Sequence, residues 1–167
     1  MKSLRARVLL LIVGFGMTTA ALLALIMYAS VSQYYSDWLY DKAGSFADRI
    51  IETHPGLWRN YEADPDGFGQ QLRQYTLYSP HTGLYLIGTD GRVLASAGEY
   101  RSFWDAFRLD LDRVRAEMAN DPNQPIHVDD PDRPRERAMA AVRPIRDGGE
   151  VAGWLLVVPR QMHFSAQ

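Results

Sequence analysis

The stretch Val8–Ala29, VLLLIVGFGMTTAALLALIMYA, sets the organisation of the whole chain, and it contains no charged residue. As a helix it would extend about 33 Å at about 1.5 Å per residue, whereas the hydrocarbon core of a bilayer is about 30 Å thick. A helix buried inside a soluble domain rarely runs so far without a charge. The stretch therefore predicts a transmembrane helix over residues 8–29.

The charges on either side of this stretch predict its orientation. Lys2, Arg5 and Arg7 precede it, and mainly acidic residues follow it from Asp37 onward. Positive charge collects on the cytoplasmic side, so we expect residues 1–7 in the cytoplasm and the remainder outside. A cleaved signal peptide is the alternative, but its apolar region is usually about 7–15 residues long. The N-terminus is thus predicted to lie inside a bacterial inner membrane, with the main domain in the periplasm.

Small residues recur at every fourth position of the apolar stretch, at Gly16, Ala20 and Ala24. Such a stripe lets two helices approach closely within lipid, which favours a homodimer. The alternative is that the stripe reflects only the frequency of small residues in membrane helices.

Charge and cysteine content limit the classes of partner. All 20 acidic residues follow the apolar stretch, whereas three of the 18 basic residues precede it. The outer part is therefore net acidic, which argues against a nucleic-acid partner. The chain has no cysteine, so disulfides and cysteine-based metal sites are excluded.

Helical periodicity continues beyond the apolar stretch, from Ser30 to about Glu52. One face of this expected helix carries Val31, Tyr35, Trp38, Lys42 and Phe46, and His54-Pro55-Gly56 ends it.

Two further helices are expected. Asp64-Pro65-Asp66 has the composition of a helix start, with Asp64 as N-cap, and Ser79-Pro80 ends that segment. Ser102–Asp105 matches a capping box, and apolar residues at helical spacing behind it predict a helix over Phe103–Ala119.

Five strands are expected around these helices. Leu84–Ile87 and Arg92–Ala95 flank Asp90-Gly91, a pair that supplies the positive φ angles of a tight hairpin turn. Three more runs follow near the C-terminus, the last two joined by Asp147-Gly148-Gly149-Glu150: Ile126–Val128, Arg137–Ile145 and Val151–Val158. Short strands linked largely by hairpins predict an antiparallel α+β domain over residues 30–158.

The segments LYLIGTDGRVLASAG and AMAAVRPIRDGGEVAGWLLVV, with the membrane helix before them, resemble a known family. These are the extracytoplasmic PAS-like (PDC or Cache-type) sensor domains of bacterial two-component histidine kinases. The resemblance implies a five-stranded antiparallel sheet covered by helices, a sensing role and a kinase as the full-length parent. In that family the last strand leads to a second membrane helix and a kinase core. Here a polar tail, residues 159–167, follows the last strand. The chain is either the truncated sensor portion or a short protein with one membrane span.

No enzyme motif is present in these residues. HExxH, GxSxG, GxxxxGK[ST] and GxGxxG are all absent, and the four histidines lie far apart. No cofactor is therefore expected. The resemblance implies that the chain detects a small ligand, a cation or a periplasmic protein. The alternative function is a single-span structural or assembly component of an envelope complex.

Two sets of residues are candidates for binding. Asp129, Asp130 and Asp132 form an acidic cluster that suits a divalent cation, although neighbouring arginines favour a self-paired, solvated loop instead. The second set combines arginines, which hold a carboxylate by paired hydrogen bonds, with aromatic residues that surround a small molecule. It comprises Tyr85, Arg101, Trp104, Arg137 and Arg143. Each of these residues has a structural alternative, the aromatic ones in the core and the arginines at the surface.

Overall fold

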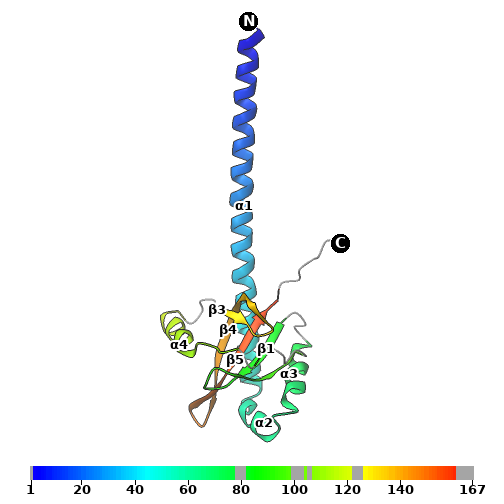
Figure 1. Cartoon of the computed structure of the whole chain (residues 1–167), viewed down its shortest axis with the longest axis vertical. Coiled ribbons are helices and arrows are strands. Elements are labelled where there is room, and N and C mark those ends of the chain that lie inside the picture. Colours follow the sequence, from blue (N-terminus) through cyan, green and yellow to red (C-terminus); the bar gives the residue numbers. More distant parts are fainter. Residues whose placement is uncertain (1, 78–81, 99–103, 105–106, 122–125, 161–167) are drawn as a thin grey trace. The chain divides into compact units, whose positions relative to one another are not determined.

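The computed structural model describes residues 2–77, 82–98, 104, 107–121 and 126–160, which contain four helices and five strands (Figure 1). The chain divides into two compact units, Met1–Trp38 and Leu39–Gln167. Helix α1 (Lys2–Thr53) contributes residues to both units. The predicted α+β class is confirmed. The predicted capping box falls on Ser102–Asp105, of which only Trp104 lies within the described residues.

The first unit consists of the apolar part of α1. Its Arg7–Val31 segment has 25 residues, a mean hydropathy of 2.4 and no buried share. Length and composition therefore suit a membrane crossing. Two polar side chains in this segment are satisfied locally, because the Thr18 and Thr19 hydroxyls donate to the carbonyls of Gly14 and Phe15 at 2.8 and 2.9 Å. These bonds reduce the cost of placing hydroxyls in an apolar environment.

The remainder of α1 belongs to the second unit and packs through one face. Tyr40, Ala43, Ala47 and Ile50 are buried there. Their spacing of three or four residues is that of one helix face. Of the face predicted from Val31 to Phe46, Phe46 packs against this core, whereas Lys42 is exposed. The predicted end of the helix is confirmed, since α1 stops at Thr53.

Two short helices follow, α2 (Leu57–Ala63) and α3 (Phe68–Thr76). Helix α2 was not predicted from the sequence, and Asp64 was predicted as the N-cap of the next helix. Instead Asp64 caps the end of α2, and its Oδ1 accepts from the Gly67 amide at 2.9 Å. Helix α3 begins only at Phe68, which is buried together with Leu72.

The sheet is antiparallel throughout and has the order β2-β1-β5-β4-β3. Its strands are β1 (Thr82–Ile87), β2 (Val93–Ser96), β3 (Ile126–Asp130), β4 (Arg133–Asp147) and β5 (Glu150–Pro159). The five predicted strands are all present. However, β3 and β4 extend into the acidic segment that the sequence analysis treated as a loop.

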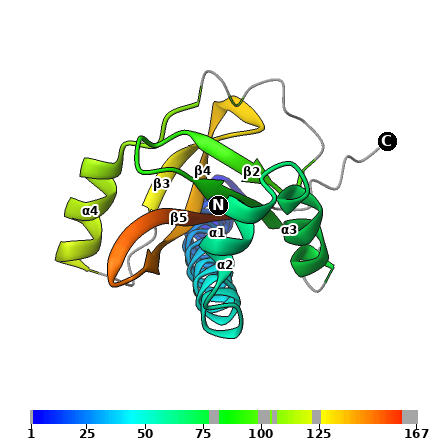
Figure 2. The ribbon, with the colours of Figure 1, turned by 90° about the horizontal axis from the view of Figure 1, so that it is seen from below.

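Both faces of the sheet are buried, which explains why β5 is almost continuously apolar. Leu155 and Val157 face α1, α2 and α3, whereas Leu156 and Val158 face α4 (Leu111–Asn120) and the segment before it. Figure 2 shows α3 and α4 on opposite sides of the sheet. A strand buried on both faces has no polar alternation, as in sheets covered by helices on each side.

Glycines shape the two predicted hairpins. In the β4–β5 hairpin Gly148 and Gly149 both have positive φ, at 60° and 93°. In the β1–β2 hairpin only Gly91 does, at 78°, so the prediction for Asp90 is wrong. The Gly91 carbonyl accepts from the Leu109 amide at 2.9 Å. A Cβ on Gly91 would collide with the Leu109 carbonyl.

The helix predicted over Phe103–Ala119 starts later than expected. Asp110 is its N-cap, and the Asp110 Oδ1 accepts from the Arg113 amide at 3.0 Å. Phe107 and Leu109 are buried in the non-helical segment before α4. The hydrogen bond from Leu109 to the hairpin loop competes with helix formation in this segment.

Candidate functional site

The residues predicted to bind a small ligand do not come together. Tyr85 is fully buried on β1, facing α4, whereas Arg143 on β4 faces α1. Arg137 is exposed on β4, and Trp104 is half-buried in a turn. Arg101 lies outside the described residues. Tyr85 and Arg143 therefore serve different faces of the sheet.

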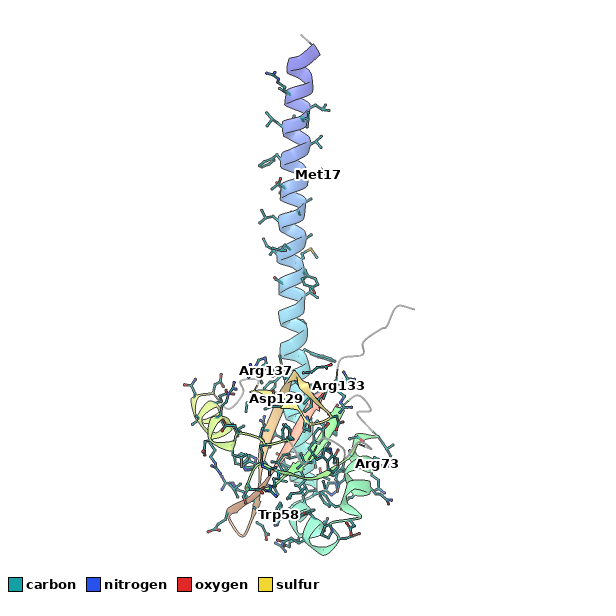
Figure 3. All side chains as sticks on the ribbon, viewed as in Figure 1. Met17, Trp58, Arg73, Asp129, Arg133 and Arg137 are labelled. Atoms are coloured by element: carbon teal, nitrogen blue, oxygen red, sulfur yellow. The ribbon has the colours of Figure 1, made fainter. Side chains whose placement is uncertain are left out.

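The three predicted acidic ligands are also divided. Asp129 is exposed, whereas Asp130 and Asp132 have side chains that are 8% and 6% exposed. Asp129 lies opposite Arg137 in the register of the β3–β4 ladder. Figure 3 labels both residues together with Arg133 at this end of the sheet. Among the described residues, no group of three or more His, Asp or Glu side chains is arranged to hold a metal ion. A divalent cation stays a prediction.

A different set of polar residues meets on the α4 face of the sheet, at the end of β5. Arg160 Nη2 donates to the Tyr85 hydroxyl at 2.8 Å and also to Asp132 Oδ2. Its distance to Asp130 Oδ1 is 4.0 Å. We call these four residues, Tyr85, Asp130, Asp132 and Arg160, the Arg160 cluster.

Local backbone features position the two carboxylates of this cluster. Asp130 ends β3 and Arg133 begins β4, so Asp132 lies in a two-residue connection. The Asp132 amide donates to Asp130 Oδ1 at 2.9 Å, which fixes the turn. Aspartate commonly stabilises turns through such bonds to backbone amides.

Small residues leave room for the aromatic ring and for Asp132. A Cβ on Gly83 would come within 2.9 Å of the Tyr85 ring, so the ring lies over Gly83 along β1. At the end of β2, Gly98 lies beside Asp132, and its amide donates to the Ser96 hydroxyl at 2.8 Å. The cluster therefore joins β1, β5 and the β3–β4 turn, with the end of β2 next to it.

The electrostatics of the cluster keep Tyr85 neutral and Arg160 charged. Burial raises the pKa of Tyr85 well above its usual value of 10.0, and the nearby charge of Asp132 raises it further. Burial lowers the pKa of Arg160, but its hydrogen bond to Asp132 and the surrounding charges outweigh this and raise it overall. With both aspartates ionised, the cluster holds two negative charges and one positive charge.

One carboxylate oxygen of the cluster lacks a hydrogen-bond donor among the described residues. Asp132 Oδ1 is buried and makes no hydrogen bond within the described part of the chain, and the same holds for Arg160 Nε. A buried acceptor without a donor costs about 1–3 kcal/mol. The site is thus able to accept a further hydrogen bond from a ligand.

The second arginine contact lies on the other face. Arg143 Nε donates to Asp48 Oδ1 of α1 at 2.8 Å, and Nη1 donates to the Val142 carbonyl at 3.1 Å. Gly44 lies under this guanidinium, because a Cβ there would be 2.9 Å from Arg143 Nη2. Burial lowers the pKa of Arg143, but the bond to Asp48 helps to raise it overall.

Sequence reasoning identified Tyr85, Asp130 and Asp132 but missed Arg160. Its partners Tyr85 and Asp132 lie 75 and 28 positions away along the chain. The available signal was an arginine placed directly after an apolar strand. That pattern is common at strand ends and does not by itself indicate a buried contact.

Comparison with solved structures shows which fold this is. The sensor domain of the V. cholerae histidine kinase DctB is similar, with a TM-score of 0.52 and 17% identity over 74% of this chain and 49% of that one. The chain has the fold of a PDC/Cache-type sensor domain. The ligand-binding domain of the Campylobacter jejuni chemoreceptor Tlp3, solved in complex with L-valine, also matches. Its TM-score is 0.36 and its identity 19%, over 80% of this chain and 61% of that one.

The assignment of the PDC/Cache-type fold rests on the structural similarity to the DctB sensor domain rather than on sequence similarity. No protein-family model matches the chain, and no curated protein sequence matches it. The chain spans about half the length of the DctB sensor domain. The resemblance predicted from the sequence is confirmed for the fold.

Proposed function

We propose that this chain is the input portion of a membrane-bound bacterial sensor histidine kinase. In this proposal α1 crosses the inner membrane through Arg7–Val31, the N-terminus is cytoplasmic, and the PDC/Cache-type domain detects a small ligand outside the cytoplasm. The observation that carries the proposal is the joining of a sensor-type fold to a helix apolar enough to span a bilayer.

The proposed site of detection is the α4 face of the sheet around the Arg160 cluster. This face holds two buried carboxylates, and one of their oxygens, Asp132 Oδ1, has no hydrogen-bond donor among the residues that the structure describes. Binding there would favour one of two arrangements of the domain, because a ligand shifts such an equilibrium by its difference in affinity for the two states. Helix α1 would then transmit the change across the membrane, in a homodimer.

A reporter kinase tests the sensing function. The sensor portion of a histidine kinase with a known output is replaced by this chain, and output is measured with amines, amino acids, carboxylates and divalent cations. We expect at least one class to change the output. A flexible glycine linker inserted near Ser32 should abolish that response, because it interrupts α1 between the apolar segment and the domain. An unchanged response in the linker variant contradicts transmission through α1.

Fusion proteins test the orientation. Alkaline phosphatase or green fluorescent protein is attached after Gln167 of the full chain. The proposal expects active phosphatase and no fluorescence, since phosphatase folds only outside the cytoplasm. The reverse result would place the domain in the cytoplasm and exclude periplasmic sensing.

Dimerisation through the small residues is tested separately. Ala20→Leu places a larger side chain on the proposed contact stripe of Gly16, Ala20 and Ala24, whereas Leu22→Ala changes a neighbouring face. We expect energy transfer between labelled copies in vesicles to fall in the first variant and to persist in the second. Equal transfer in both would contradict the contact through this stripe.

A further inference from the structure

In the Arg160 cluster, the guanidinium of Arg160 lies against two carboxylates and a phenol hydroxyl. Two aspartates with side chains 6% and 8% exposed face one guanidinium, and the neutral Tyr85 hydroxyl completes the contact. The hydroxyl accepts from Arg160 Nη2. These groups recognise a planar or tetrahedral nitrogen cation, because carboxylates and a phenol oxygen all accept hydrogen bonds from N–H groups.

We infer that a ligand with a protonated amine or guanidinium group binds Asp132 in place of Arg160 and thereby frees the end of β5. The inference rests on the proposed sensing function and names the chemical class of ligand for the same site. Arg160 then competes with the ligand for Asp132. In the ligand-free chain, the contact between Arg160 and Asp132 holds the end of β5 in place.

The charge balance favours a cation over an anion as the incoming group. With two carboxylates and one guanidinium the cluster is negative, and an added anion would face both aspartates. Asp132 Oδ1, which has no donor among the described residues, also favours a cation. A ligand with several N–H groups can donate to both carboxylate oxygens of Asp132. Removing a guanidinium from a buried carboxylate is costly unless another cation replaces it. Exchange, rather than simple release, is therefore the favoured event.

The two sides of the contact differ in their freedom to move. Asp132 is fixed by the turn, since its amide donates to Asp130. The Arg160 side chain is 36% exposed, so it has a path to water. A guanidinium on a long, flexible side chain is readily accommodated in water. The acceptors thus stay in place while the arginine leaves.

The position of Arg160 links this exchange to the backbone. Pro159 pairs with Thr82 at the last position of the β1–β5 ladder, and Arg160 follows directly. The side-chain contacts of Arg160 connect the backbone immediately beyond that ladder to β1 and to the β3–β4 turn. Losing them would loosen the end of β5, from which the chain continues toward its C-terminus.

Chemical rescue of a truncated arginine tests the site. The full chain carrying Arg160→Ala is purified in detergent, and its Tm is measured with methylguanidinium at millimolar concentration. We expect the Tm to rise by about 5 °C at a concentration tenfold above Kd, since a ligand that binds only the folded state stabilises it. Methylurea, a neutral molecule of similar shape, should give no shift.

Two variants serve as matched controls. Arg160→Ala combined with Asp132→Asn removes the acceptor and should show no rescue. Arg143→Ala removes the arginine on the other sheet face, where the partner Asp48 is half-exposed, and it should show no rescue either. Equal shifts in all three variants would reveal a non-specific effect and overturn the inference.

Hydrogen exchange in the unmodified chain provides a second test that does not depend on the folding of the alanine variant. We expect methylguanidinium to speed amide exchange several-fold in Leu155–Arg160 and to leave the other end of β5, at the turn around Gly148-Gly149, unchanged. Asp132→Asn should show the faster exchange without any ligand. Protection of Leu155–Arg160 by methylguanidinium, or stabilisation of the chain by acetate instead, would overturn the inference. Neither result bears on the kinase reporter, which tests the sensing function independently.

Discussion

Two arginines connect the sheet to the segments beside it, one on each face, but their environments differ. Arg143 of β4 reaches α1 and pairs with Asp48, whose side chain is 49% exposed. Arg160, after β5, pairs with Asp132, whose side chain is 6% exposed. The comparison separates two roles for an ion pair. Asp48 can return to water at low cost, whereas Asp132 cannot lose its cation without a replacement.

The difference also suggests what each contact does. The Arg143 pair lies at Gly44 of α1, next to the buried apolar face of the helix that already packs on the sheet. The Arg160 pair holds a backbone segment at the edge of the ladder. We therefore expect the first contact to add modestly to packing and the second to control a local equilibrium.

The largest effect is expected from Arg160→Ala. It leaves two buried aspartates without their cation, so the free energy of unfolding should fall by about 3 kcal/mol. Denaturant unfolding of the full chain in detergent measures this loss. Arg146→Ala is the control, because Arg146 is exposed on β4 and should change stability by less than about 0.5 kcal/mol. Equal losses in the two variants would show that the aspartates do not depend on Arg160.

Tyr85→Phe tests the neutral partner of the cluster through its pH dependence. An unfolded tyrosine ionises near pH 10, whereas burial and Asp132 raise the pKa of Tyr85 in the folded chain. Above about pH 10 the unfolded state therefore binds fewer protons than the folded state, and the free energy of unfolding falls by about 1.4 kcal/mol per pH unit. The full stability is present below that pH.

The phenylalanine variant lacks this decline but loses one hydrogen bond, worth about 1 kcal/mol at neutral pH. The free energies of unfolding of Tyr85→Phe and of the unmodified chain, plotted against pH, should therefore cross at about pH 11. Unfolding measurements between pH 7 and pH 11.5 would show the crossing. Parallel curves would mean that Tyr85 ionises as easily in the folded chain as in the unfolded one.

Arg143→Ala should cost about 1 kcal/mol, less than the loss at Arg160. The carboxylate of Asp48 is half-exposed, so added salt should weaken its pair with Arg143, whereas the pair of Arg160 with the buried Asp132 carboxylate should respond little. Comparing each variant with the unmodified chain at low and high salt measures both effects. A stronger salt dependence at Arg160 than at Arg143 would reverse the assignment of the two contacts.

Local sequence signals predicted the hairpins but not the contacts between them. Gly148-Gly149 and the Asp90-Gly91 pair each lie in the turn between two strands that are adjacent in sequence, so the sequence was sufficient to place both hairpins. Helix α4 was misplaced because Phe107, Leu109 and Leu111 fit a strand while Phe107, Leu111 and Val114 fit a helix. The contact of Leu109 with Gly91 decides between them, and it joins distant parts of the sequence.

The candidate site was harder to predict for the same reason. Tyr85, Asp130 and Asp132 were recognised by residue type, but their partner is a single arginine far along the chain. Conversely, Arg143 was recognised, but its contact is with α1 on the opposite face from Tyr85. Residue type indicates which side chains can bind a ligand. Only the pairing of the strands shows which of them share a face.

The smallest effect is expected from Gly44→Ala, and it isolates the geometry of the Arg143 contact. Alanine favours a helix over glycine by about 1 kcal/mol, whereas its Cβ would meet Arg143 Nη2, the movable end of a side chain. These effects oppose each other, so stability should change by less than about 0.5 kcal/mol. The coupling energy between Arg143 and Asp48, measured by a double-mutant cycle, should nevertheless fall in the Gly44→Ala background. An unchanged coupling would show that the guanidinium does not depend on the space above Gly44, and the Arg143 contact would then tolerate more movement of α1 than its geometry suggests.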